Sequence, residues 1–271
     1  MSSPFREVVR RAAAALLLLF SGSVLARDLI VCADPDNLPF SQRDGSGFEN
    51  RIAELIAKDL DARLVYRWQP LLRGALRKTI GAGLCDVLAG VPADPARRAT
   101  TDAYYRSGYA FVTRRGWGPP LSSFDDPRLR TAKVGVPLLG ADGAAAPAAL
   151  ALARHGVIDH VTGFPVYGAS PVGQRMVEAL ADGRIDIAVL WGPQAGYFAA
   201  QARESMTIAL APAEAGTPQT FAIAMAVRAD EDALRDEINA ALARERPQIA
   251  AILAEYHLPL LAVDDARTHQ P

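Results

Sequence analysis

Strand-like and helix-like segments alternate along most of this chain, which restricts it to a small set of folds. Apolar side chains recur every three or four residues in segment 48–60, as they do on one face of a helix. Alternating strands and helices form parallel sheets covered by helices. The sequence therefore predicts an α/β protein. The expected strands cover 29–33, 64–68, 85–91, 109–114, 132–136, 160–166, 185–190 and 220–228, and the expected helices 48–60, 71–82, 143–155, 171–181, 231–244 and 248–257.

The pattern occurs twice, which predicts two lobes of similar construction. GAGLCDVLAG (81–90) and ADGRIDIAVLWG (181–192) both join the end of a helix to a Gly, an Asp and an apolar strand that closes on Gly. Between them, segment 115–130 is rich in Gly, Pro and Ser, as expected where the chain crosses between lobes. We predict lobe 1 from 27–115 plus 217–263 and lobe 2 from 116–216, joined by a two-stranded hinge and followed by a loose tail, 264–271.

The first 26 residues have the layout of a cleaved secretory signal peptide. Arg6, Arg10 and Arg11 precede an apolar run at 12–20, and small residues lead up to Ala26. The alternative is a membrane anchor, but the run is much shorter than the roughly 20 residues needed to cross a bilayer. We therefore expect a mature chain, without a membrane span, that works in the periplasm.

The two cysteines, Cys32 and Cys85, both belong to that mature chain. In an oxidising compartment an even number of cysteines favours pairing, and these two fall in strands that we expect to be neighbours. The alternative is a pair of buried free thiols, since Cys also packs as a small apolar residue.

Several catalytic and binding templates do not fit the sequence. The four histidines have no His or Cys partner at zinc-ligand spacing, and GASPVG around Ser170 lacks the second Gly of a nucleophile elbow. No Walker loop or complete GxGxxG is present, and DPDNLP lacks the Gly and distal Glu of a calcium loop. With a formal net charge of −1 and no basic block, nothing indicates nucleic-acid binding. We expect a protein that is not an enzyme and needs neither metal nor cofactor.

Polar and aromatic residues that follow the predicted strands are the candidates for a binding cleft. In open α/β sheets, ligands bind at the carboxyl ends of the strands. Each residue alone could be an ordinary turn or core residue. Their joint placement after strand ends is what favours a binding cleft. The candidates are Asp34, Asp36, Asn37, Phe40, Glu49, Trp68, Val91, Arg98, Tyr104, Tyr105, Asp142, Trp191 and Tyr197.

Four segments resemble the first lobe of bacterial type II periplasmic solute-binding proteins of the amino-acid type: VCADPDNLPF, GFENRIAELIAKDL, GLCDVLAGVP and TTDAYYRSGYAFV. Three segments, CADPDNLPFS, LLGADGAAAPAALALARHGVIDHVTGFPVYG and IDIAVLWGPQAGYFA, are similar more narrowly to the MoxJ and XoxJ group. That group is associated with quinoprotein methanol dehydrogenases. Together the matching segments span almost the whole mature chain.

This resemblance implies a two-lobed, non-catalytic periplasmic accessory protein. Its implied partner is a PQQ-dependent methanol or alcohol dehydrogenase, either lanthanide-dependent or not. The accessory protein is expected to help this enzyme to mature or become active. The dehydrogenase's cytochrome c and a small-molecule ligand are further candidate partners. Two alternatives stay open: the substrate-binding component of an ABC importer for a small polar solute, and an enzyme such as a dehydratase on the same scaffold.

One departure from the amino-acid-binding pattern concerns the arginine that clamps the ligand carboxylate in those relatives. Here the candidates Arg97 and Arg98 lie close to Thr100, so the spacing is shifted. A guanidinium forms a bidentate carboxylate clamp only where its geometry is held. The shift counts against amino-acid binding, and both arginines could equally be solvated loop charges.

Overall fold

The computed structural model describes residues 27–71, 74–94, 99–139, 145–166 and 168–263, and the predicted signal peptide and tail lie outside these ranges. The strands are β1 (Asp28–Ala33), β2 (Asp36–Asn37), β3 (Ser41–Gln42), β4 (Arg63–Trp68), β5 (Val87–Pro92), β6 (Tyr105–Arg114), β7 (Val134–Leu138), β8 (Val161–Pro165), β9 (Ile187–Trp191), β10 (Met206–Leu210), β11 (Thr220–Val227) and β12 (Leu260–Leu261). The helices are α2 (Phe48–Asp59), α3 (Ala75–Lys78), α4 (Pro147–Arg154), α5 (Val172–Ala181), α6 (Gly192–Ala200), α7 (Asp232–Arg244) and α8 (Arg246–Glu255), with 3-10 turns at Ile80–Ala82 and Pro127–Arg130.

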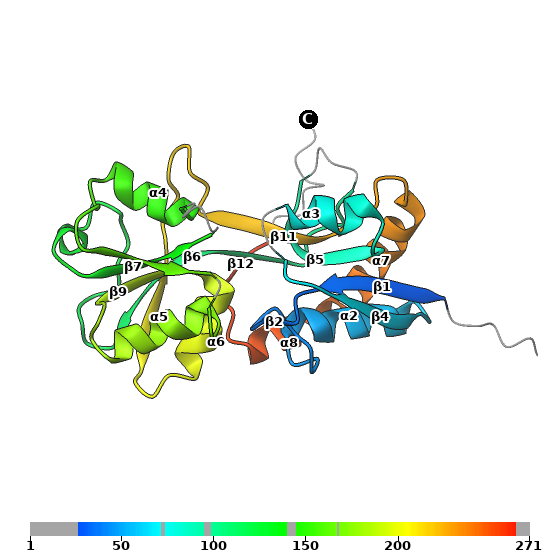
Figure 1. Cartoon of the computed structure of the whole chain (residues 1–271), viewed down its shortest axis with the longest axis horizontal. Helices are drawn as coiled ribbons and strands as arrows, with labels where there is room; N and C mark the ends of the chain where they lie inside the picture. The colour runs from blue at the N-terminus through cyan, green and yellow to red at the C-terminus, as the bar shows by residue number, and fades with distance from the viewer. Residues whose placement is uncertain (1–26, 72–73, 95–98, 140–144, 167, 264–271) are drawn as a thin grey trace, which may run out of the picture.

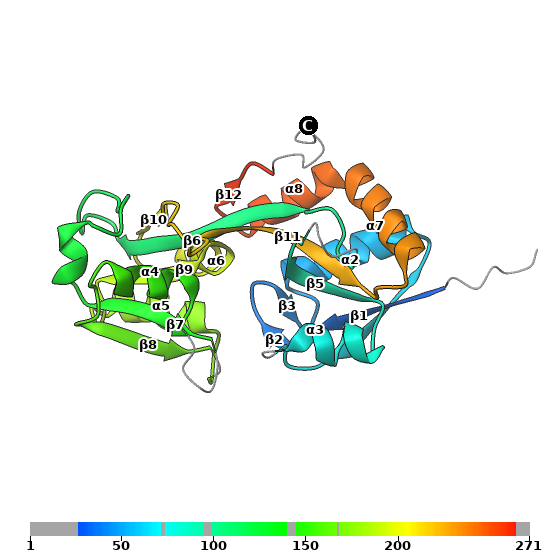
Figure 2. The ribbon, with the colours of Figure 1, turned by 90° about the horizontal axis from the view of Figure 1, so that it is seen from above.

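Two bodies of helix-covered sheet are joined by long strands (Figure 1). In one body β1 pairs in parallel with β4 and β5, and in the other β7 pairs in parallel with β8 and β9. Strand β6 runs through both, because its first half pairs with β11 and its second half with β9 and β10. Figure 2 shows β6 and β11 side by side between the bodies. The α/β, two-lobed fold class with a two-stranded connection is confirmed, and the exact lobe limits stay a prediction.

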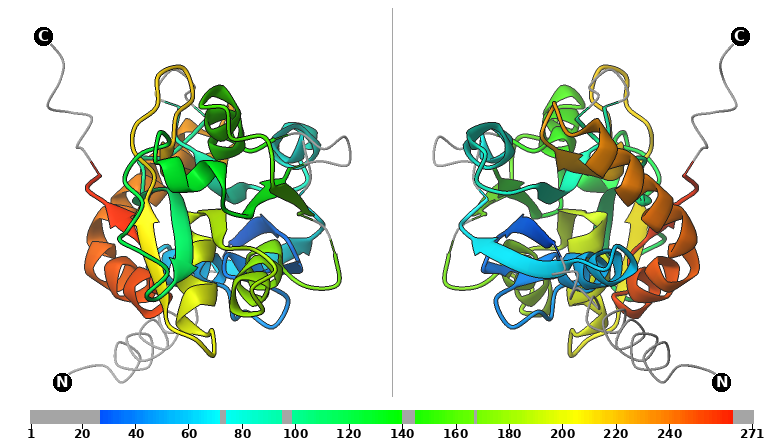
Figure 3. Two further views of the ribbon diagram at one scale, coloured as in Figure 1. Left: turned by 90° about the vertical axis from the view of Figure 1, so that its left-hand side faces the viewer. Right: turned by 90° about the vertical axis from the view of Figure 1, so that its right-hand side faces the viewer.

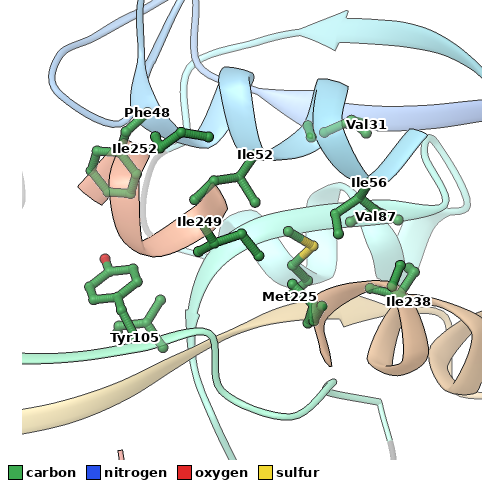
Figure 4. Packing of buried hydrophobic residues seen from close by; sticks show 14 of the residues in the cluster. Val31, Phe48, Ile52, Ile56, Val87, Tyr105, Met225, Ile238, Ile249 and Ile252 are labelled. Atoms are coloured by element: carbon green, nitrogen blue, oxygen red, sulfur yellow. The ribbon is translucent and has the colours of Figure 1, made fainter. Parts of the chain in front are cut away.

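The first body is built around the apolar face of α2. Phe48, Ile52 and Ile56 are fully buried, as the periodicity of segment 48–60 predicts (Figure 4). They pack against strands β1, β5 and β11 and against helices α7 and α8. These two helices lie next to one another along one flank of the molecule (Figure 3). Burying each such side chain contributes about 1.5–3 kcal/mol, so this face accounts for much of the helix's stability.

The second body is apolar on both faces of its sheet. In β9, Ile187 and Val189 face a cluster that includes α4, while Ala188 and Leu190 face a cluster that includes α5 and α6. Successive residues of a strand point to opposite faces, so a strand covered on both sides reads as a continuous apolar run. This explains the sequence IDIAVLW. Figure 1 shows α4 on one side of β7 and β9, and α5 and α6 on the other.

The structure differs from the sequence-based prediction in a few elements. The helix expected at 71–82 is reduced to α3 and a 3-10 turn, because Gly74 is left-handed (φ +80°) and Thr79 leaves the helical region. The helix expected at 143–155 is α4, which begins at Pro147. Strand β6 begins at Tyr105, four residues earlier than expected, and neither β10 nor α6 was predicted.

The predicted disulfide between Cys32 and Cys85 is present, with the two Cα atoms 5.7 Å apart. It ties the end of β1 to the loop before β5, and these strands are neighbours in the sheet. The bond is buried among Ile80, Leu88 and Ala226. None of the helices in the described ranges is long and apolar enough to cross a membrane.

Candidate functional site

A cavity of about 250 Å³ opens between the two bodies. Three predicted residues, Asp34, Asp36 and Asn37, lie on its wall, which also includes Leu71. The opposite wall comes from the second body and consists of Val166, Gly168, Ser170, Pro171, Val172 and Gln194. Among these described lining residues only Asp34 and Asp36 carry a carboxyl group, and none is a histidine. The cleft therefore offers oxygen acceptors and small neutral groups, without a histidine that could work as a general base.

Asp34 uses its carboxylate to hold the cleft wall together. One oxygen accepts a hydrogen bond from the amide of Asp36 (3.0 Å) and the other from the amide of Leu71 (2.8 Å). Its carbonyl oxygen also accepts a hydrogen bond from the hydroxyl of Ser41 (2.8 Å). The predicted ligand contact is thus a side chain that fixes the loop after β1 to the segment after β4.

Glu49 is a buried residue that is linked through the half-buried Tyr104 to the exposed Gly90. The Tyr104 hydroxyl donates to the Glu49 carboxylate (3.3 Å) and accepts from the Gly90 amide (3.2 Å). Glu49 is only 8 % exposed. Burial raises its pKa to about 7, while the hydrogen bond from Tyr104 opposes this shift. Glu49 is therefore partly protonated near neutral pH.

Trp68, the last residue of β4, lies against an aromatic ring and a guanidinium. Its ring stacks on Tyr66, with centroids 4.5 Å apart, and the Arg43 guanidinium lies 5.6 Å from its centroid. Phe40, in contrast, packs on Phe48 in the core of the first body. Val91 is a half-buried residue of β5, paired with Ala224.

The aromatic residues predicted from the second body lie at the junction with the first. Trp191 contacts Tyr109 of β6 and Phe221 of β11, at centroid distances of 5.5 and 5.8 Å. Burial raises the pKa of Tyr105, and a side-chain hydrogen bond with Trp191 opposes this shift. Tyr197 stacks on Tyr256 at 5.6 Å, which joins α6 to the end of α8.

The described candidates thus do not form one site. They divide among a cleft wall, a buried carboxyl, the Trp68 stack and an aromatic cluster between the bodies, and Phe40 and Val91 belong to none of these groups. Arg98 and Asp142 lie outside the described residues. Sequence reasoning missed Arg43, Tyr66, Tyr109, Phe221 and Tyr256. Alternation along β4 could have linked Tyr66 to Trp68, but the other contacts join elements far apart in the chain. No group of three His, Cys, Asp or Glu side chains that could hold a metal ion occurs in the described part of the chain.

Comparison with known proteins identifies the family. Residues 29–258 match the model for bacterial extracellular solute-binding proteins, family 3. The chain is 33 % identical over 261 residues to Protein MoxJ of Methylorubrum extorquens, covering 89 % of this chain and 84 % of that protein. It is 30 % identical over 280 residues to Protein MoxJ of Paracoccus denitrificans, covering 95 % and 98 % respectively.

The fold agrees with a solved relative. The crystal structure of the periplasmic binding protein XoxJ from Methylobacterium extorquens AM1 superposes with a TM-score of 0.73 at 34 % identity, covering 87 % of this chain and all of that one. The suspected MoxJ and XoxJ resemblance is therefore confirmed. The chain belongs to the bacterial extracellular solute-binding proteins, family 3, and is a homologue of MoxJ and XoxJ.

Proposed function

We propose that this chain is a non-catalytic periplasmic accessory protein that helps a PQQ-dependent methanol or alcohol dehydrogenase to mature or become active. Its similarity to MoxJ along nearly the whole chain carries the proposal. Proteins of that group are associated with quinoprotein dehydrogenases, as the sequence resemblance implies. The proposed location follows from the signal-like residues 1–26 and from the buried Cys32–Cys85 disulfide, which persists in an oxidising compartment.

The geometry of the cleft supports a role without transport. The carboxylate of Asp34, the leading candidate for a ligand contact, is occupied by two backbone amides. Glu49 is buried and hydrogen-bonded to Tyr104, so both carboxyl groups already bind other parts of the chain itself. A receptor for a small polar solute orients it through a few precisely placed polar groups. A protein partner, in contrast, can use the outer rim.

Co-purification from the periplasm tests this function. A tagged chain, expressed from its own promoter in cells that make the dehydrogenase, is expected to retain the dehydrogenase on an affinity column. Deleting the gene is expected to lower dehydrogenase activity, and expression of the chain in trans should restore it. A tagged chain that retains no dehydrogenase, together with full activity in the deletion strain, would refute the proposal.

Calorimetry separates this role from solute transport. The mature chain is titrated with alcohols, organic acids, amino acids and lanthanide chelates, and we expect no heat of binding beyond dilution. Saturable binding of one of these solutes, weakened by Asp34→Asn, would favour an importer component. Deletion of the gene would then impair uptake of that solute and leave the dehydrogenase unaffected.

A further inference from the structure

A stacked ladder of three side chains stands at the rim of the cleft. Tyr66 and Trp68 project from the same face of β4, because residues two apart in a strand share a face. Their rings stack at 4.5 Å with an interplanar angle of 27°, and the Arg43 guanidinium covers the Trp68 ring. We call Tyr66, Trp68 and Arg43 the rim ladder.

The rim ladder is continuous with the cleft wall. The amide of Arg43 donates to the carbonyl of Pro35 (3.0 Å), and Pro35 lines the cavity. Trp68 is the last residue of β4, and Pro70 and Leu71, which follow it closely, also line the cavity. A partner seated on the ladder would therefore reach the mouth of the cleft.

Within the described part of the chain the Arg43 guanidinium forms no hydrogen bond or ion pair, although Asp44 follows it directly and Asp36 pairs with its neighbour Gln42. The Arg43 side chain is exposed, and its only described contact is with the Trp68 ring. A second pair of the same kind, Arg128 over Trp117 at 5.3 Å, differs in this respect, because Asp126 holds that guanidinium with two hydrogen bonds. Arg43 on Trp68 is therefore a cation–π pair whose guanidinium has no carboxylate bound to it in the described ranges.

We propose that the rim ladder docks an acidic segment of the partner dehydrogenase, with a carboxylate on Arg43 and an apolar side chain against Trp68. The inference rests on the proposed function and names the surface that would perform it. A few residues supply most of the binding energy at protein interfaces, and Trp, Tyr and Arg are enriched among them. The Tyr66 hydroxyl donates to the carbonyl of Asn50 (3.3 Å), so the ladder is held in place before a partner arrives.

Binding of the purified dehydrogenase to the immobilised mature chain tests the proposal by biolayer interferometry. We expect Trp68→Ala to weaken binding at least tenfold, within the range of an interface hot spot. Arg43→Gln should weaken it by about fivefold and reduce the dependence of the association rate on salt, and Arg43→Glu should weaken it further. Trp117→Ala and Arg130→Gln, two matched changes in the second body, should bind within about twofold of the unmodified chain.

The outcomes separate this inference from the proposed function. If the unmodified chain binds the dehydrogenase and both Arg43 variants bind equally tightly, the rim ladder is not the docking surface, although the accessory role stands. If the unmodified chain does not bind at all, both ideas are overturned. Circular dichroism shows whether Trp68→Ala is folded, and the exposed Arg43 substitutions test the surface independently of it. Sedimentation with anionic phospholipid vesicles tests a membrane as the alternative occupant. If the chain bound vesicles through Trp68 and did not bind the dehydrogenase, the proposal of a protein partner would be refuted.

Discussion

At the scale of single residues, Gly90 makes room for the buried carboxyl of Glu49. Gly90 has φ +75°, and a Cβ at this position would lie 2.5 Å from a Glu49 carboxylate oxygen. We expect Gly90→Ala to lower the free energy of unfolding by about 3 kcal/mol, from backbone strain and overpacking together. Urea denaturation measures this. The matched control is Gly83→Ala, with φ +67° and open space around its Cβ, which should cost only about 1 kcal/mol. If Gly90→Ala and Gly83→Ala lowered the free energy of unfolding equally, Glu49 would not require the space at Gly90.

The raised pKa of Glu49 makes stability depend on pH. In the unfolded chain its pKa is near 4.5, and in the folded protein it is about 7, so the folded state keeps the proton over this range. The contribution is fully present below about pH 4.5 and is lost as pH rises to about 7. The loss amounts to about 3 kcal/mol. We expect Glu49→Gln to be more stable than the unmodified protein at pH 7.5 but not at pH 4.5, as measured by urea denaturation at both values. A constant difference between the two proteins across that range would contradict the assigned pKa.

At the scale of elements, α6 packs on the first body through two glycines. A Cβ on Gly196 would lie 2.0 Å from the carbonyl oxygen of His257, and one on Gly192 would lie 2.4 Å from the Ser107 hydroxyl. Alanine favours a helix over glycine by about 1 kcal/mol, but here the close approach outweighs that preference. We therefore expect Gly196→Ala to destabilise the protein by about 2 kcal/mol, and guanidinium denaturation measures it. Gly81→Ala is the control: its nearest contact would be 3.5 Å away, so it should be neutral or slightly stabilising.

Elements with a regular apolar pattern could be predicted from the sequence, and those defined by a partner could not. The face of α2 and the buried run of β9 follow from local periodicity. Helix α6 begins with Gly-Pro, which reads as a turn, although Pro suits the first turn of a helix and Gly196 is required only by its neighbour. Strand β10 is half-buried throughout and depends on pairing with β6.

The candidate site was predictable only in part. Strand ends placed Asp34 beside the cleft, but its bond to the amide of Leu71 depends on how two distant segments meet. The same limit applies to Trp191 and Tyr197, whose partners come from β6, β11 and the end of α8. Sequence shows that such residues follow strands. It does not show whether they face a ligand or another part of the chain.

At the scale of the whole molecule, Trp191 packs against the apolar cores of both bodies. Its contacts with Tyr109 and Phe221 lie on the two connecting strands, so it couples the stability of one body to that of the other. We expect the unmodified protein to unfold in one calorimetric transition and Trp191→Ala to unfold in two. Truncating this half-buried ring costs less than the roughly 3–5 kcal/mol of a fully buried Trp, but it removes a contact that both bodies share.

Trp117→Ala is the matched control for this uncoupling. Trp117 is also half-buried, but among the described core clusters it packs against that of the second body alone. The control substitution should lower the temperature of a single transition without splitting it. Two transitions in the unmodified protein, or one in Trp191→Ala, would show that the bodies are not coupled through this residue. A split confined to Trp191→Ala would mean that packing of this ring at the junction makes the two bodies unfold as one unit.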